Sequence, residues 1–198
     1  IFGGGMRIDT GSKVLIRRSA ITGNTATSTS GAVYGGGIYA SASQLDVRST
    51  TVAGNTAAGT TAARGGGIAG AGGTVSLRHV TLSGNVTNSG TADRYGGNLY
   101  VSGTTPTVAD SILTGGVSSA GHENCSSAAA TLPVPSGRNI DSGTTCGFGA
   151  GQLSSTDPQL QDLANAGGPT DARVPKRTSP AVVQAGACPD DAIDQRGA

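Results

Sequence analysis

The chain has little charge and few aromatic side chains. Of its 198 residues, 13% are Asp, Glu, Lys or Arg, 3% are Phe, Trp or Tyr, and none is Trp. The net charge of +1 argues against nucleic acid as the main partner, because domains that bind nucleic acid concentrate positive charge. No apolar run approaches the ~18 residues that cross a bilayer, so we predict no transmembrane segment.

A signal peptide and a phosphate-binding loop are also missing. The chain opens at Ile1–Gly5, which looks like the inside of a repeat, and we therefore expect a mature or trimmed piece of a larger precursor. The glycine-rich segments are not followed by Gly-Lys-Ser or Gly-Lys-Thr. This argues against nucleotide binding, and the sequence predicts no cofactor.

Glycine is abundant, with 34 residues, and Ser, Thr, Ala and Asn fill much of the remainder. Such a composition is compatible with a disordered linker, but disordered chains usually combine high net charge with few β-branched residues. Here Val, Ile and Thr recur at regular intervals. The composition therefore favours a β-rich fold with many tight turns.

Two short motifs recur in phase, with a period of 30 to 32 residues. The first is a glycine triplet followed by an apolar residue, at Gly3–Met6, Gly35–Ile38, Gly65–Ile68 and, in degraded form, Gly96–Leu99. The second ends in Gly-Asn, at Ile21–Asn24, Val52–Asn55 and Leu82–Asn85, and loses its Asn at Leu113–Gly116. A repeat of this length indicates stacked units of supersecondary structure.

Apolar residues alternate ahead of each Gly-Asn motif. In the first repeat they are Val14, Ile16 and Ile21, and the next repeats have Leu45, Val47 and Val52, then Val75, Leu77 and Leu82. The period of two at the first pair of positions is typical of a half-buried strand. We predict an all-β fold, a right-handed single-stranded parallel β-helix whose ~30-residue coils stack at strand spacing and share one core. Propeller, leucine-rich and collagen repeats fit the spacing less well.

The repeated asparagines, Asn24, Asn55 and Asn85, each follow a glycine at a turn. Asn tolerates the left-handed backbone conformation, and amides stacked on successive coils can hydrogen-bond along the helix axis. We interpret this column as structural, with a ligand-binding row of amides as the alternative.

The repeats resemble those of pectin-lyase-like parallel β-helix proteins and of bacterial surface proteins, through Gly35–Tyr39 and Gly54–Ala57. The C-terminal third is similar to the end of the choice-of-anchor Q family, whose ordered motifs match Thr156–Leu160, Asn165–Thr170, Ser179–Val182 and Asp194–Gly197. The resemblance implies a bacterial protein that is secreted and displayed on the cell surface, and it implies no known activity. Two departures are Val183-Gln184, where the family has an Asp, and the lack of the usual closing segment with its Cys.

Many parallel β-helices cleave polysaccharides, and such enzymes need paired carboxylates or a base beside calcium-binding carboxylates. The only Glu is Glu123, and the repeat acids Asp9, Asp46, Asp93 and Asp110 do not align in one column. His79 and His122 are isolated from other metal-binding residue types. We therefore predict neither catalytic residues nor a metal site.

One basic column stands out. Arg17, Arg48 and Arg78 lie seven residues before the repeated Asn and follow buried positions, so they should point outward in a row that ends at Ala109. The simplest interpretation is a solvated row offset by nearby acids such as Asp46. The alternative is a strip that binds an acidic polysaccharide through bidentate contacts.

The three cysteines and the change in composition suggest the domain organisation. Cys125 and Cys146 bracket a Ser/Ala/Pro-rich stretch, 126–137, and we predict that they form a disulfide, which leaves Cys188 free. By the family resemblance, the partner of Cys188 would lie in the closing segment. We expect one domain with regular coils over 1–118, a tethered excursion over 119–150 and an irregular cap over 151–198.

These observations favour a non-enzymatic extracellular scaffold or adhesin-like protein, with an extracellular polysaccharide or a cell-surface component as its partner. Two alternatives stay open. One is a polysaccharide lyase or hydrolase fragment whose active coils lie upstream of Ile1. The other is a subunit that self-assembles into a filament through uncapped coils.

Overall fold

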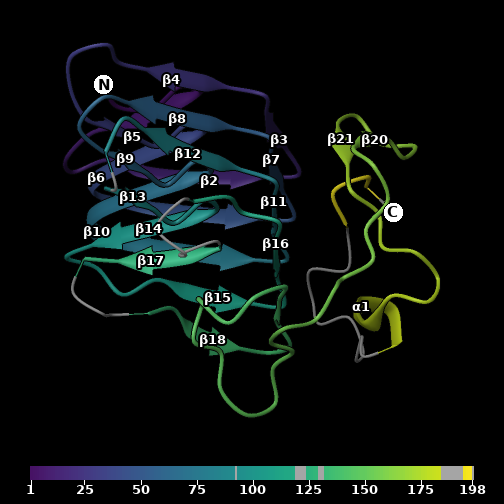
Figure 1. Ribbon diagram of the computed structural model, residues 1–198. Helices are drawn as coiled ribbons and strands as arrows, with labels where there is room; N and C mark the ends of the chain where they lie inside the picture. The colour runs from purple at the N-terminus through teal and green to yellow at the C-terminus, as the bar shows by residue number, and fades with distance from the viewer. Residues whose placement is uncertain (92, 119–123, 129–131, 184–193, 198) are drawn as a thin grey trace.

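The computed structural model describes residues 1–91, 93–118, 124–128, 132–183 and 194–197. Nearly all of their regular structure is β-strand, and strands of successive coils pair in parallel (Figure 1). The predicted fold class, a parallel β-helix, is confirmed. In the described part of the chain there is no helix with the length and apolar character needed to cross a bilayer.

Four parallel sheets form the walls of the stack. The first contains β1 (Met6–Ile8), β2 (Lys13–Arg17), β6 (Ile38–Arg48), β10 (Ile68–Arg78), β14 (Leu99–Ser102), β15 (Thr107–Ala109), β17 (Cys125–Ser127) and β18 (Val134–Ser136). The second contains β3 (Ala20–Thr22), β7 (Thr51–Ala53), β11 (Thr81–Ser83), β16 (Ile112–Thr114) and β19 (Ile140–Asp141). The third contains β4 (Thr25–Thr27), β8 (Thr56–Gly59) and β12 (Val86–Ser89), and the fourth contains β5 (Val33–Tyr34), β9 (Ala63–Arg64) and β13 (Arg94–Tyr95).

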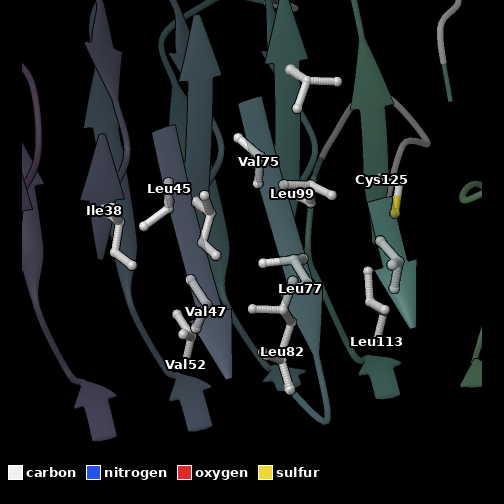
Figure 2. Close-up of a cluster of buried hydrophobic side chains, with 14 of the residues drawn as sticks. Ile38, Leu45, Val47, Val52, Val75, Leu77, Leu82, Leu99, Leu113 and Cys125 are labelled. Atoms are coloured by element: carbon white, nitrogen blue, oxygen red, sulfur yellow. The ribbon is translucent and has the colours of Figure 1, made fainter. Parts of the chain in front are cut away.

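The core consists of apolar columns, one residue from each coil. Register pairs Leu45 with Val75, and Val47 with Leu77, so the alternating positions of the repeat fall on top of one another. Figure 2 shows these side chains pointing into a common interior, together with Ile38, Val52, Leu82, Leu99, Leu113 and Cys125. No single coil could bury these faces alone, so stability comes from contacts between neighbouring coils.

The glycine triplets allow the coils to pass close to one another. Gly35 has a positive φ of 71°, which a β-branched or bulky residue would rarely adopt. A Cβ at Gly36 would overlap the Gly66 carbonyl oxygen, and one at Gly37 would lie 3.1 Å from Cγ of Asn55. The three complete triplets therefore combine a left-handed turn with two positions where only hydrogen fits.

At the Gly-Asn turns, the residue with the left-handed backbone conformation is not the one that we expected from the sequence. The left-handed residue is the glycine, as at Gly54 with a φ of 63°, and Asn24, Asn55 and Asn85 have ordinary backbone conformations. The side chain of the Asn, and not its backbone tolerance, is therefore what distinguishes this position.

The predicted Cys125–Cys146 disulfide is confirmed. Both cysteines lie in the hydrophobic core with Phe148, and Leu153 extends the second sheet by a parallel bridge to Ile140. Cys188, whose predicted state is a free thiol, lies outside the described residues. The domain boundaries predicted at 118 and 150 stay a prediction.

The C-terminal segment contains β20 (Ala164–Asn165), which pairs antiparallel with β21 (Asp171–Ala172), and α1 (Pro180–Val183). Figure 1 places these elements along the side of the stack, next to the second sheet. There the Thr51 hydroxyl donates a buried hydrogen bond of 2.7 Å to Oε1 of Gln195. Gln195 in turn donates through Nε2 to Thr170 and to the Asp171 carbonyl, which ties the end of the tail to the stack.

Candidate functional site

Aromatic side chains are scarce in this chain, yet five of the six gather in one group. The chain has four Tyr and two Phe, and the exception is Phe148, which lies in the hydrophobic core. Within the group, Phe2 is exposed and Tyr100 is buried. We call this group, with two arginines that lie against it, the aromatic–arginine cluster. It contains Phe2, Arg7, Tyr34, Tyr39, Arg64, Tyr95 and Tyr100.

Register between coils assembles the cluster as two columns, one on each side of the glycine turn. Before the turn, Phe2 pairs with Tyr34, Tyr34 with Arg64, and Arg64 with Tyr95. After it, the column in β1, β6, β10 and β14 reads Arg7, Tyr39, Ala69, Tyr100. Ala69 is the one small residue at these positions, and Tyr100 pairs with it in register.

The N-terminal half of the cluster presents ring surface to solvent. Phe2 is 40% exposed, and its ring centroid lies 4.6 Å from that of Tyr39 and 5.5 Å from that of Tyr34. The guanidinium of Arg7 lies 5.5 Å from the Phe2 centroid and is paired with Asp9, with 2.8 Å between Nε and Oδ1. These spacings are typical of attractive ring–ring and cation–π contacts.

The other half is organised around Arg64. Its guanidinium carbon lies 5.5 Å from the ring centroid of Tyr34, 5.8 Å from that of Tyr95 and 5.4 Å from that of Tyr100. It donates to both carboxylate oxygens of Asp93, at 3.2 and 2.6 Å, and through Nη1 to the hydroxyls of Tyr34 and Tyr100 at 3.3 Å. Arg64 therefore holds three rings and one carboxylate in fixed positions.

The surroundings of Arg64 and Tyr100 favour the ordinary charge state of each. Burial alone lowers the pKa of the Arg64 guanidinium, but the hydrogen bond to Asp93 and the nearby tyrosines outweigh it, so the pKa is raised. Burial raises the pKa of Tyr100, and Arg64 offsets only part of that rise. Near neutral pH, Arg64 is thus charged and Tyr100 keeps its hydroxyl proton.

The arginines predicted to form a row are neighbours in the structure. Arg17 pairs in register with Arg48, Arg48 with Arg78, and Arg78 with Ala109. Arg48 is bound by Asp46 of its own strand, at 2.6 Å between Nη2 and Oδ2 and 3.1 Å between Nε and Oδ1. The middle of the row is thus partly neutralised, and its role in binding stays a prediction.

The predicted asparagine column forms part of a longer ladder of side-chain amides. Nδ2 of Asn24 donates to Oδ1 of Asn55 at 2.9 Å, and Nδ2 of Asn55 donates to Oδ1 of Asn85 at 2.9 Å. The backbone amides of Asn24 and Asn55 donate to the same two oxygens. Asn55 and Asn85 are fully buried, and each lies at the turn between a strand of the second sheet and a strand of the third.

In the fourth coil the ladder continues through a different residue. Gly116 occupies the turn position, and Asn98 occupies the last position of the glycine triplet, from which it accepts the Nδ2 bond of Asn85 at 2.7 Å. Asn98 then donates to Asn124 at 2.7 Å, and Asn124 donates to the buried carboxylate of Asp141 at 2.6 Å. Asp141 also accepts from the backbone of Gly143 and Cys146, so its buried oxygens are satisfied.

The histidines do not build a metal centre in the described part of the chain. His79 lies at a left-handed turn with φ of 53°, and its Nε2 is 3.7 Å from Oδ2 of Asp110. No group of three or more His, Cys, Asp or Glu side chains comes together among residues that the structure describes. His122 and Glu123 lie outside those residues.

Two sets of residues were missed from sequence alone. The aromatic–arginine cluster had a detectable signal, because Phe2, Tyr34, Arg64 and Tyr95 each directly precede a glycine motif. Because the residue type differs from coil to coil, the sequence did not reveal that these residues share one position of the repeat. Asn98, Asn124 and Asp141 gave no periodic signal. They lie at other positions of the coil, from which they take over the hydrogen bonds of the turn asparagine.

The chain matches no protein-family model, and comparison with curated proteins and with solved structures gave no significant match. The fold itself defines the class: this is a parallel β-helix repeat protein. The finer resemblances to pectin-lyase-like and choice-of-anchor Q proteins stay predictions.

Proposed function

We propose that the protein is a non-enzymatic extracellular β-helix that binds polysaccharide through the aromatic–arginine cluster. The observation that carries the proposal is the concentration of five of six aromatic residues in one group, with the Phe2 ring exposed, in a chain that is only 3% aromatic. Tyr and Arg dominate binding surfaces because they offer large rigid contact areas together with polar groups.

The arrangement suits a sugar chain. A pyranose ring has an apolar C–H face, which stacks on the electron-rich face of an aromatic ring, and hydroxyls at its edge that need polar partners. The cluster supplies exposed ring surface at Phe2, beside the half-buried Tyr39, hydroxyls at Tyr34 and Tyr39, and carboxylates at Asp9 and Asp93. Stacking and hydrogen bonding require no general base or metal.

Two observations support an extracellular location. The Cys125–Cys146 disulfide is typical of oxidising compartments. The motifs between Thr156 and Gly197 resemble the choice-of-anchor Q family, whose members are bacterial proteins displayed on the cell surface. We therefore place the chain on the outside of a bacterial cell.

The test is a polysaccharide array probed with the parent protein, a Phe2→Ala/Tyr39→Ala variant and a Leu15→Ala control. Leu15 is 54% exposed on β2, outside the cluster, so the control removes apolar surface of similar accessibility. We expect the parent and the control to bind the same polymers and the cluster variant to bind them about tenfold more weakly. Absence of binding to any polysaccharide, or equal binding by all three proteins, would contradict the proposal.

A further inference from the structure

The charges of the aromatic–arginine cluster are already compensated within the protein. Arg64 is paired with Asp93 and Arg7 with Asp9, so the two cations of the cluster face two carboxylates. Asp9 is 65% exposed and Asp93 35% exposed, so both carboxylates can be reached by a ligand. An acidic ligand at this surface would meet these negative charges.

Arg64 also lacks the open fork that an anion requires. A guanidinium binds a carboxylate best through two parallel N–H groups. In Arg64, Nε and Nη2 already bind the two oxygens of Asp93, and Nη1 binds the hydroxyls of Tyr34 and Tyr100. A uronic acid or sulfate group would have to displace Asp93 to make the same contact.

A neutral sugar meets no such obstacle. Its hydroxyls can donate to the exposed carboxylates of Asp9 and Asp93, which are acceptors only. Its C–H face can stack on Phe2, whose ring is 40% exposed and lies beside Tyr39. The fixed positions of the rings reduce the entropy lost on binding.

From this we infer that the cluster selects uncharged polysaccharides over acidic ones. The inference rests on the proposed function, because it names the ligand class of the same site. It also separates this site from the row of Arg17, Arg48 and Arg78, for which binding of an acidic polymer is a separate, untested prediction.

Matched polymers that differ only in charge test the selection. One pair is methyl-esterified and de-esterified homogalacturonan, and a second is hydroxyethyl cellulose and carboxymethyl cellulose. We expect the parent protein to bind the uncharged member of at least one pair about tenfold more tightly than the acidic member. Because no counterions are released, this binding should change less than about twofold between about 50 and 200 mM salt.

Two variants connect the result to the cluster. Phe2→Ala/Tyr39→Ala should lose the uncharged polymer. Asp9→Asn, an exposed change that removes the partner of Arg7, should bind the acidic polymers several-fold more tightly than the parent, and salt should reverse the gain.

The outcomes distinguish the two proposals. If the parent prefers the acidic polymers and Phe2→Ala/Tyr39→Ala abolishes that binding, the cluster binds polysaccharide but the inferred selection is wrong. If the cluster variant changes the binding of no polymer, charged or uncharged, the proposed function itself fails.

Discussion

Two columns of this protein repeat in the sequence in the same way and end in opposite environments. Asn24, Asn55 and Asn85 recur at one position of three coils, and so do Arg17, Arg48 and Arg78. The amides are linked to one another from coil to coil, and two of them are fully buried. Arg48, in the middle of the basic row, is bound to Asp46 within its own strand.

The difference shows what a periodic residue reveals. Recurrence at the repeat period predicts which side chains will lie above one another, because coils stack in register. It does not predict whether they stabilise one another. Amides can donate and accept in turn, so stacking satisfies them, whereas stacked like charges repel and take partners elsewhere.

The largest expected effect is on the ladder. Asn55→Ala removes the bonds from Nδ2 to Ile21 and Asn85 and those that Oδ1 accepts from Asn24, and it should lower the free energy of unfolding by about 3 kcal/mol. Urea denaturation measures the change, and Arg48→Ala in the same coil is the matched comparison. Should Asn55→Ala unfold like the parent yet lose a ligand, the amide column is a binding row.

An intermediate effect on stability is expected in the fourth coil, where Asn98 supplies the ladder amide in place of a turn asparagine. Asn98→Gly should cost about 2 kcal/mol, because the side chains of Asn85 and Asn124 lose their partner. Adding Gly116→Asn restores the residue pattern of the earlier coils and should recover about half of that loss.

Gly116→Asn alone should also destabilise the protein. In the third coil, a Cβ at Gly67 would lie 2.9 Å from Nδ2 of Asn85, so two asparagines at these paired positions compete for one space. A double-mutant cycle by urea denaturation measures the coupling between positions 98 and 116. If the changes in the free energy of unfolding for the two single variants simply add in the double variant, an asparagine at one position does not replace an asparagine at the other.

The smallest effect on stability is expected at the basic row. Arg48→Ala/Arg78→Ala should unfold within about 0.5 kcal/mol of the parent, because exposed ion pairs contribute little. If the row binds an acidic polysaccharide, the affinity should be modest, should fall steeply with salt and should be lost in this variant. Equal binding by both proteins would leave the row without a binding role.

The coil architecture could be predicted because the residues that define it recur. Val47 and Leu77 keep their distance from the repeated Asn, and the glycine triplets keep their phase, so pattern alone identified a parallel β-helix. The disulfide was predictable because Cys125 and Cys146 bracket one excursion. Both inferences depended on position along the chain and needed no knowledge of neighbouring side chains.

The rest depends on contacts between positions that the repeat does not relate. The side-chain amide of Asn98 takes the place of the turn asparagine that the fourth coil lacks. Asp141 pairs in register with Leu113, so a carboxylate follows an apolar residue at the same position. Tyr100 contacts Arg64 across coils, beside Ala69 in register. Each case required the register of the coils, which no single repeat contains.

The hydrogen bonds of the amide ladder all run in one direction along the solenoid, and the ladder ends at Asp141. Each asparagine of the ladder donates an amide hydrogen to the next member of the ladder, and each one after Asn24 also accepts one from the member before. An extra coil can therefore be inserted without changing the pattern. Asp141 has no hydrogen to pass on, and the oxygens of its carboxylate are taken up by Asn124, Gly143 and Cys146. Gene duplication or protein engineering could therefore lengthen this protein by whole coils ahead of Asp141, whereas a coil added behind it would find no amide to continue from.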